Sequence, residues 1–269
     1  MLYMKLIPGD KQASKSPTVC AAVRTFGNGT QINHKAARVQ HLPLFSGISS
    51  AARGEIVSAA HEKVFSRGQT IFFQGDPEKQ EILLTWGSVK TTHLGRDGTE
   101  VILRLSGPGD LIGATGLGST CLHRSTAQAL GSSRALVWSA TFFEALLGRF
   151  PILRHNVARI LDEQLRELEE RFCEISTENV TNRVGHEIAR LVNRVGERVN
   201  GAVKISLSRE ELAQLTGTTQ FTVSRSLSQW KEEGIVSTGR RAVMVRDPHA
   251  LAELSERGRT TTRFERSRR

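Results

Sequence analysis

The segment that decides the fold reads SREELAQLTGTTQFTVSRSLSQWKEEGIVSTGRRAVMVR and spans residues 208–246. It opens with Ser208 and Glu211, which have the spacing of a capping box. In that motif the hydroxyl accepts a hydrogen bond from the backbone three residues on, and the carboxylate reaches back to the first N–H. Gly217 stands where a helix ends in a sharp turn, because glycine adopts the left-handed conformation at no steric cost. These signals predict a short helix that stops at a tight turn.

A second helix is predicted directly after this turn. Thr218 or Thr219 can cap it, and Val223, Leu227 and Trp230 recur along one side as a buried helix face does. Two short helices joined by a glycine turn are typical of a helix-turn-helix. The residues of the exposed face of the second helix are Gln220, Phe221, Thr222, Ser224 and Arg225.

The segment after the second helix has the pattern of a β-hairpin. Residues 235–237 and 242–245 are runs that favour strands, and Gly239-Arg240-Arg241 stands between them as a basic tip. A hairpin in this position makes the motif a winged helix-turn-helix, which we predict over residues 179–251.

The chemistry of the exposed face suits duplex DNA. The major groove admits one α-helix, and its base edges pair with glutamine at adenine and with arginine at guanine. Threonine and serine hydroxyls and helix N-termini suit phosphate oxygens. The side chains predicted to contact DNA are Thr218, Thr219, Gln220, Phe221, Thr222, Ser224, Arg225, Arg240 and Arg241. The alternative interpretation is a helical hairpin with a polar outer face and no nucleic-acid partner.

The charge distribution favours the same partner. The net charge of the 269-residue chain is +10, and residues 181–269 hold 17 Lys/Arg against 10 Asp/Glu. A basic C-terminal module on a nearly balanced N-terminal part biases the partner toward a polyanion. A basic surface that only confers solubility is the other interpretation of the charge.

An apolar stripe lies before the helix-turn-helix. Its members recur at spacings of 4, 3, 4 and 3 residues, with Arg, Glu and Asp on the other faces, as in a coiled-coil seam. The stripe consists of Leu161, Leu165, Leu168, Phe172 and Ile175. We expect residues 151–178 to form a long helix that pairs with the same helix of a second copy. A helix packed on its own domain would show the same stripe.

The region of residues 39–150 turns to a β-strand pattern after a short helical segment. Turn residues such as Asp97-Gly98, a strong hairpin signal, separate the apolar runs. Val101, Leu103 and Leu105 alternate and are predicted to form one buried face. Many short strands at this spacing indicate a sandwich or roll. The predicted strands cover residues 63–65, 70–73, 82–86, 89–92, 101–105, 127–130 and 135–138.

The two ends and the cysteines narrow the class of protein. Residues 1–38 show little periodicity, and residues 252–269 are rich in Arg and Thr, so we expect a flexible arm and a basic flexible tail. No apolar run reaches 18 residues and the start lacks the apolar core of a signal peptide, so no membrane contact is expected. Three widely spaced cysteines suit a reducing cytoplasm.

In this order, the features resemble the CRP/FNR family of bacterial transcription regulators, over roughly residues 42–254. The resemblance implies an α+β fold. An N-terminal antiparallel β-roll, similar to a cyclic-nucleotide-binding domain, would be joined by a long dimerisation helix to a C-terminal winged helix-turn-helix. The segments that carry the resemblance are Leu42-Pro43-Leu44-Phe45, Phe73-Gln74-Gly75-Asp76, Gly107-Pro108-Gly109-Asp110-Leu111-Ile112-Gly113, Leu212-Ala213-Gln214-Leu215-Thr216-Gly217 and Thr222-Val223-Ser224-Arg225.

The resemblance also implies a mode of action without enzymatic activity. It implies a homodimer on a two-fold symmetric operator with half-sites about one helical turn apart, strong DNA bending, and RNA polymerase as a partner. By position, Arg225 matches the family's guanine-reading arginine and Arg209 a phosphate-contacting arginine. Gln220 and Phe221 depart from the common pattern: where many members place a cytosine-reading glutamate, Phe221 can only touch a thymine methyl. We therefore expect an operator unlike those of the best-known members.

The effector is predicted to bind in the β-roll. The positions that cradle a cyclic phosphoribose in nucleotide-binding members hold Gly113-Ala114 and Arg124-Ser125 here. Arg124 can grip a phosphate with help from Ser125, but Ala114 cannot bind a ribose hydroxyl. The long helix also has no Ser or Thr between residues 157 and 174 to touch a base. These two gaps argue against control by a cyclic nucleotide, and Arg124 bracing a loop through an ion pair is the other interpretation.

The sequence also bears on two other cofactors. An iron–sulfur cluster normally needs four cysteine ligands, and Cys20, Cys121 and Cys173 are scattered, which argues against it. Haem stays open, because the helix-turn-helix resembles that of members that respond to nitrogen oxides, some of which use haem. The histidines available as an axial ligand are His61, His93, His123 and His155.

Two functions of another class compete with DNA binding. A β-roll alone also fits a cupin-like enzyme, but Leu94 and Gly95 follow His93, so the His-x-His pair of metal-dependent cupins is missing there. The other alternative is a cyclic-nucleotide-like ligand-binding module that never touches DNA. The winged motif and its positive charge argue against this second alternative.

Overall fold

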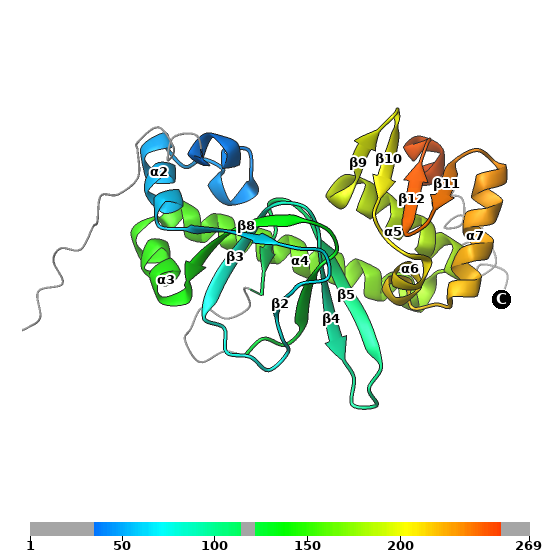
Figure 1. The fold of residues 1–269 in the computed structure, drawn as a ribbon, viewed down its shortest axis with the longest axis horizontal. Coiled ribbons are helices and arrows are strands. Elements are labelled where there is room, and N and C mark those ends of the chain that lie inside the picture. The colour runs from blue at the N-terminus through cyan, green and yellow to red at the C-terminus, as the bar shows by residue number, and fades with distance from the viewer. Residues whose placement is uncertain (1–34, 114–121, 254–269) are drawn as a thin grey trace, which may run out of the picture.

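The computed structural model describes residues 35–113 and 122–253, and Figure 1 shows a β-rich half and a mainly helical half joined by the long helix α4 (Pro151–Thr177). The β-rich half begins with a helix over residues 35–39, the 3-10 helix η1 (Pro43–Phe45) and α2 (Ser50–Ser58). It ends with α3 (Ala140–Arg149), directly before α4.

Eight antiparallel strands form the β-roll. They make two four-stranded sheets with the orders β1-β8-β3-β6 and β2-β7-β4-β5, which confirms the predicted roll. The strands are β1 (His61–Phe65), β2 (Thr70–Phe72), β3 (Gln80–Trp86), β4 (Val89–Leu94), β5 (Glu100–Ser106), β6 (Leu111–Ile112), β7 (Thr126–Ala129) and β8 (Ser133–Ser139).

Both faces of β3, an inner strand of the first sheet, are buried. On β3, Ile82 and Leu84 point into the core between the two sheets, whereas Leu83 points into a second core beneath α2, α3 and α4. Trp138 lies in this second core, and its indole Nε1 donates a hydrogen bond to the Ile56 carbonyl at 2.9 Å. Burial on both sides explains why the strand is a continuous apolar run rather than an alternating one.

Strand β5 corrects one prediction. Ile102 and Leu105 are its buried apolar residues, whereas Val101 and Leu103 are exposed. The register of β4 and β5 shifts between Thr91 and Thr92, so a bulge at Leu103 breaks the alternation. Such an extra residue turns the following side chains to the other face, and the prediction of one face with Val101, Leu103 and Leu105 was therefore wrong.

The C-terminal half contains helices and a four-stranded sheet of order β11-β12-β10-β9. The β9–β10 hairpin was not predicted, and its turn places Asn200 and Gly201 at positive φ. A short helix over residues 248–253 closes this half. The other elements are α5 (Val180–Val195), β9 (Glu197–Val199), β10 (Ala202–Ile205), α6 (Arg209–Thr216), α7 (Gln220–Glu232), β11 (Val236–Gly239) and β12 (Ala242–Val245).

Helix α4 belongs to both halves. At a rise of 1.5 Å per residue it is about 40 Å long. Its first half buries Leu153, Val157 and Ile160 in the second core of the β-roll. Asn156 anchors it there, because its side-chain amide donates to the carbonyls of Leu44 and Ser46 at 2.9 and 2.8 Å.

The expected flexible ends need a correction at their inner borders. Residues 1–34 and 254–269 lie outside the described residues, but residues 35–39 are helical and bury Ala36 and Val39. Likewise, residues 252 and 253 belong to the last helix, so the expected tail was begun too early. None of the described helices combines the length and the hydropathy needed to span a membrane.

Candidate nucleic-acid interface

Helix α6 begins with the predicted capping box. The Ser208 hydroxyl accepts from the Glu211 backbone N–H at 3.1 Å, and the Glu211 carboxylate accepts from the Ser208 N–H at 2.8 Å. Two N–H groups that the helix itself cannot satisfy are therefore paired. Leu212 and Leu215 of this helix are buried in the core of the C-terminal half.

The turn after α6 has the predicted geometry. Gly217 is left-handed, with φ 60° and ψ 45°, and the next N–H, of Thr218, donates to the Ala213 carbonyl at 3.0 Å. The Thr216 hydroxyl donates to the Leu212 carbonyl at 2.7 Å. Since non-glycine residues adopt this conformation only at a cost, Gly217 permits the chain to turn directly into α7.

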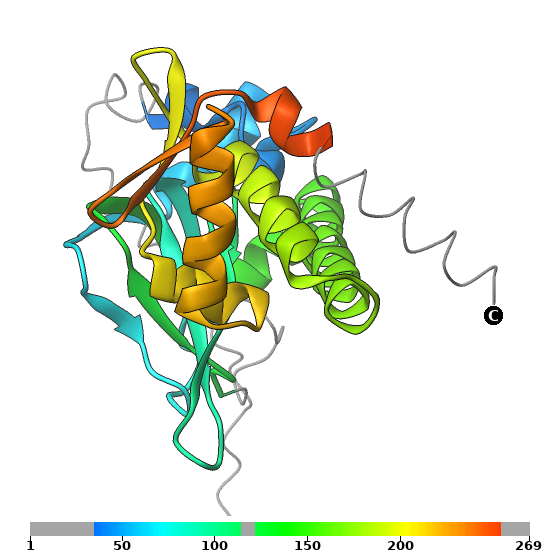
Figure 2. The same ribbon diagram turned by 90° about the vertical axis from the view of Figure 1, so that its right-hand side faces the viewer.

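Helix α7 is capped by Thr219 rather than Thr218, because the Thr219 hydroxyl accepts from the Thr222 N–H at 3.3 Å. Val223, Leu227 and Trp230 are buried, as predicted. Figure 2 shows α7 on the outer side of the C-terminal half. Of the residues predicted to form its exposed face, Gln220, Phe221 and Arg225 are exposed, whereas Thr222 and Ser224 are half-buried.

The wing lies beside the start of α6. Arg240 and Arg241 form the turn between β11 and β12, and Arg241 adopts a left-handed φ of 59°. The Arg241 guanidinium donates to the Glu211 carboxylate at 3.1 Å, and the Arg209 guanidinium donates to the Thr238 hydroxyl at 3.2 Å. The fold thus joins the basic tip of the wing to the N-terminal end of α6.

A polar network beneath this surface was not predicted. Arg190 of α5 forms a bidentate pair with Glu174 of α4 at 2.7 and 2.8 Å and also contacts Glu187 at 2.8 Å. Burial alone would lower the pKa of Arg190, but the hydrogen bonds that it donates to Glu174 and Glu187, together with their negative charges, hold its pKa above the ordinary value. The network ties α5 to the end of α4, and the Arg190–Glu174 pair carries no local sequence signal because its partners lie on different helices.

A cavity of about 320 Å³ lies between the β-roll and α4. It contains Gly113 and Ser125, two of the predicted effector-binding residues. Gly113 has a φ of +78°, and an added Cβ would come within 2.9 Å of the Phe72 and His123 rings. Arg124 is exposed and does not belong to the described lining, and Ala114 lies outside the described residues. The apolar lining consists of Leu103, Leu111, Ile112, Leu161, Leu165 and Leu168.

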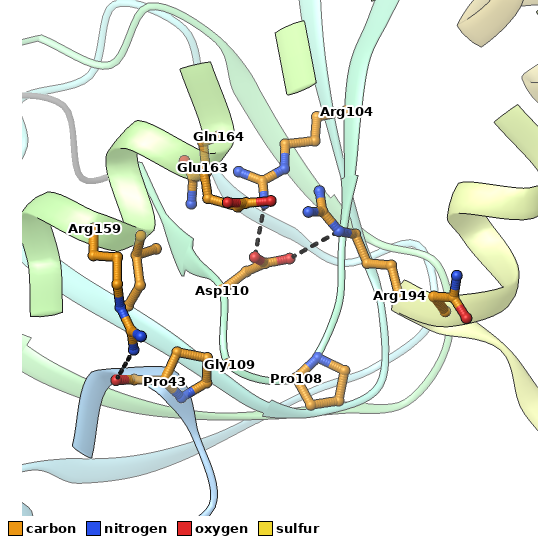
Figure 3. Close-up of a pocket in the computed structure, with 11 residues that line it drawn as sticks. Pro43, Arg104, Pro108, Gly109, Asp110, Arg159, Glu163, Gln164 and Arg194 are labelled. Atoms are coloured by element: carbon orange, nitrogen blue, oxygen red, sulfur yellow. Dashed lines mark hydrogen bonds and ion pairs between the residues drawn. The ribbon is translucent and has the colours of Figure 1, made fainter. Parts of the chain in front are cut away.

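A second cavity, of about 370 Å³, lies where α5 meets the β5–β6 loop (Figure 3). There Asp110 accepts from Arg104 at 2.7 Å and lies 3.9 Å from the Arg194 Nε. Burial lowers the pKa of Arg104, and Asp110 opposes this effect. A Cβ on Gly107 would come within 2.1 Å of the Arg194 carbonyl, so glycine is needed for this close approach. The glycine-rich run therefore contacts the C-terminal half and also leads to the first cavity, where Gly113 lies.

The four candidate haem ligands lie on different segments of the chain. His61, His93 and His155 are exposed, and the His93 Nδ1 lies 3.0 Å from the Arg124 carbonyl oxygen. His123 is buried and stacks on Phe72 with ring centroids 3.6 Å apart, and burial lowers its pKa. Among the described residues, no three His, Cys, Asp or Glu side chains gather as a metal site.

One of the three cysteines lies among the described residues. Cys173 is exposed on α4, and Cys20 and Cys121 lie outside the described residues.

Comparisons with known proteins agree with this architecture. Residues 182–254 match the family model of a Crp-like helix-turn-helix domain, and residues 62–150 match that of a cyclic nucleotide-binding domain. The chain is 33% identical over 215 residues to the cyclic AMP receptor protein of Thermus thermophilus, covering 79% of this chain and 96% of the relative. It is 26% identical over 196 residues to the fumarate and nitrate reduction regulatory protein of Escherichia coli, covering 72% of this chain and 78% of the relative.

Solved structures show the same fold. FixK2 from Bradyrhizobium japonicum superposes with a TM-score of 0.64 at 24% identity, covering 72% of this chain and 96% of that chain. TTHB099, a transcriptional regulator of the CRP family from Thermus thermophilus, superposes with a TM-score of 0.62 at 26% identity, with the same coverage of both chains.

Proposed function

Because the chain belongs to the CRP/FNR family of DNA-binding transcription regulators, we propose that it acts as a homodimer on a two-fold symmetric operator and that an effector bound between the β-roll and α4 controls this binding. The relatives are regulators rather than enzymes, so the cupin-like alternative is set aside. For a bacterial regulator of this kind we expect RNA polymerase as a partner and the cytoplasm as its location.

The observation that carries the proposal is the division of α7 into two faces. Val223 and Trp230 are buried, whereas Phe221 is 79% exposed and Arg225 is also exposed. This division supports insertion of α7 into the major groove, with Arg225 reading a guanine. In that position Gln220 would face an adenine and Phe221 a thymine methyl.

The remaining predicted contacts go to the phosphates. Hydroxyls at the start of a helix and exposed guanidinium groups suit phosphate oxygens and fix the register of the protein on the duplex. Arg241 is expected to exchange its bond with Glu211 for a phosphate, since both partners are oxygen anions. The residues assigned to these contacts are Arg209, Thr218, Thr219, Thr222, Ser224, Arg240 and Arg241.

The exposed stripe on α4 supports the homodimer. Leu165, Leu168, Phe172 and Ile175 are between 49% and 70% exposed in the single chain, and Leu161 is half-buried. A contiguous apolar surface of this kind marks an interaction site. The same helix of a second copy matches the seam spacing, and pairing it there covers the stripe.

The effector cavity shares residues with this stripe. Leu165 and Leu168 line the cavity and also belong to the proposed dimer seam, so a ligand there can favour one arrangement of the two helices over another. The surface of the cavity is mainly apolar, although Arg104, Glu167 and Arg171 also line it. Arg124, the arginine predicted to grip a phosphate, is exposed and lies outside the described lining. We therefore propose an effector other than a cyclic nucleotide.

Selection of bound fragments from random duplex DNA tests the proposal. We expect a two-fold symmetric motif with half-site centres about 34 Å apart, and an affinity that falls with salt as phosphate contacts release counterions. If no symmetric motif is enriched, the two helix-turn-helix units of a dimer, its two reading heads, do not bind the operator as a pair. Binding that is indifferent to both sequence and salt would refute DNA recognition by this surface.

A further inference from the structure

Arg171 of α4 contacts three other elements, β5, α5 and α6. Its side chain is buried, with only 8% of the residue exposed. The Nη1 group donates to the Leu103 carbonyl of β5, and Nη2 donates to the Leu215 carbonyl of α6 at 2.7 Å. The Nε atom lies 3.4 Å from the Glu187 carboxylate of α5. One guanidinium thus joins the β-roll, the dimer helix and the helix-turn-helix.

The chemistry of these contacts favours a defined geometry. A guanidinium is planar and directs its donors in fixed directions, so the two carbonyls must keep their relative positions to be bound together. Leu215 lies in the last turn of α6, where carbonyls have no partner within the helix and a cation is favourable. Leu103 is at the bulge of β5. A buried charge is costly without such partners, so loss of either carbonyl would be strongly unfavourable.

A second arginine serves as an internal comparison. Arg183 of α5 donates to the carbonyls of Thr216 and Gly217 at 3.2 and 3.4 Å, and to the Glu178 carbonyl at 3.2 Å. It therefore holds the same end of α6 as Arg171 does. Its contacts, however, stay within the C-terminal half and the end of α4, whereas those of Arg171 extend to the β-roll.

Apolar packing accompanies the Arg171 contact. Ile102 and Leu105 of β5 are buried in the same core as Val184, Leu212 and Leu215 of the C-terminal half. Leu103 and Arg171 also line the effector cavity. The wall of the cavity is therefore continuous with the end of α6.

We propose that Arg171 is a positioning residue that sets the orientation of the helix-turn-helix relative to the dimer helix and the effector cavity. This inference rests on the proposed dimer with two reading heads. Fixed orientation raises the effective concentration of the second head once the first is bound. Loss of Arg171 then weakens binding to a full operator more than binding to one half-site.

The test compares two DNA duplexes, the selected symmetric operator and the same duplex with one half-site scrambled, by fluorescence anisotropy. We expect Arg171→Gln to weaken full-site binding at least tenfold and half-site binding less than twofold. Arg171→Lys keeps the positive charge but lacks the planar guanidinium that binds two carbonyls at once. Its full-site affinity should therefore lie between those of Arg171→Gln and the wild type. Arg183→Gln should weaken binding to both duplexes. Arg166→Gln, at an exposed position paired only with Asp162 among the described residues, should change neither.

Hydrogen–deuterium exchange without DNA provides a readout independent of the dimer. Arg171→Gln should speed amide exchange in β5 and in the α6–α7 turn together, whereas Arg183→Gln should speed it in the turn alone. Unchanged exchange in β5, equal losses on both duplexes, or tighter full-site binding would each overturn the inference. A wild type that binds both duplexes equally would refute the paired heads instead, and the exchange data would then decide the role of Arg171.

Discussion

Replacing Leu165 and Leu168 together with glutamate should convert the protein into monomers. The two residues are 54% and 52% exposed in the single chain. Burying a whole leucine side chain contributes about 1.5–3 kcal/mol, so covering the exposed half contributes about 0.8–1.5 kcal/mol. A symmetric dimer covers four such leucines, which amounts to about 3–6 kcal/mol. That free energy corresponds to a dissociation constant weakened by about 10²–10⁴-fold. Paired carboxylates in an apolar seam add a further cost, so this range is a lower bound.

Sedimentation velocity over a concentration series measures this change directly. The control is Phe142→Glu, which also places a carboxylate on an exposed apolar position, on α3 rather than on the stripe. We expect the control to sediment as the wild type does and the double variant to sediment as a monomer with an unchanged circular dichroism spectrum. A double variant that stays dimeric at the concentrations at which the wild type is dimeric would show that the stripe is not the dimer seam.

Three further changes probe the reading head, the turn and the β-roll. Arg225→Ala should weaken specific binding by about 1–3 kcal/mol and relax the preference at one base pair, as measured by anisotropy on operators varied at single positions; an unchanged preference would place another residue at that base. Gly217→Ala should lower the thermal stability by about 1 kcal/mol or more, because alanine resists the left-handed φ of 60°; a melting curve identical to that of the wild type would contradict this. Burial, with a smaller effect from Glu78, raises the pKa of Glu81 from 4.5 to about 7. The folded state therefore keeps a proton that the unfolded chain releases, so the free energy of unfolding should fall by up to about 3 kcal/mol as the pH rises through this interval. Urea denaturation of Glu81→Gln should show a much flatter pH dependence, and an equally steep one would exclude Glu81 as the cause.

The reading head could be predicted from the sequence because its signals are local. The capping box, the left-handed glycine and the buried side of α7 each depend on residues within one or two helical turns. Ser208, Gly217 and Trp230 therefore have the environments that their spacing indicates. The exceptions are Thr222 and Ser224, which are half-buried. At about 100° per residue, both lie one step to either side of the buried Val223, at the edge of the buried face rather than opposite it.

The features that sequence analysis missed are those that depend on distant partners. The bulge at Leu103 has no marker in β5 itself, since it is a property of the pairing with β4. Arg171 is one of several charged residues in α4, and nothing in its neighbours distinguishes it from Arg166, which is exposed. The difference arises because the bulge at Leu103 and the end of α6 both reach the same side of α4. For this reason the local sequence pattern does not predict the contacts that connect the two halves, although it does predict the two halves themselves.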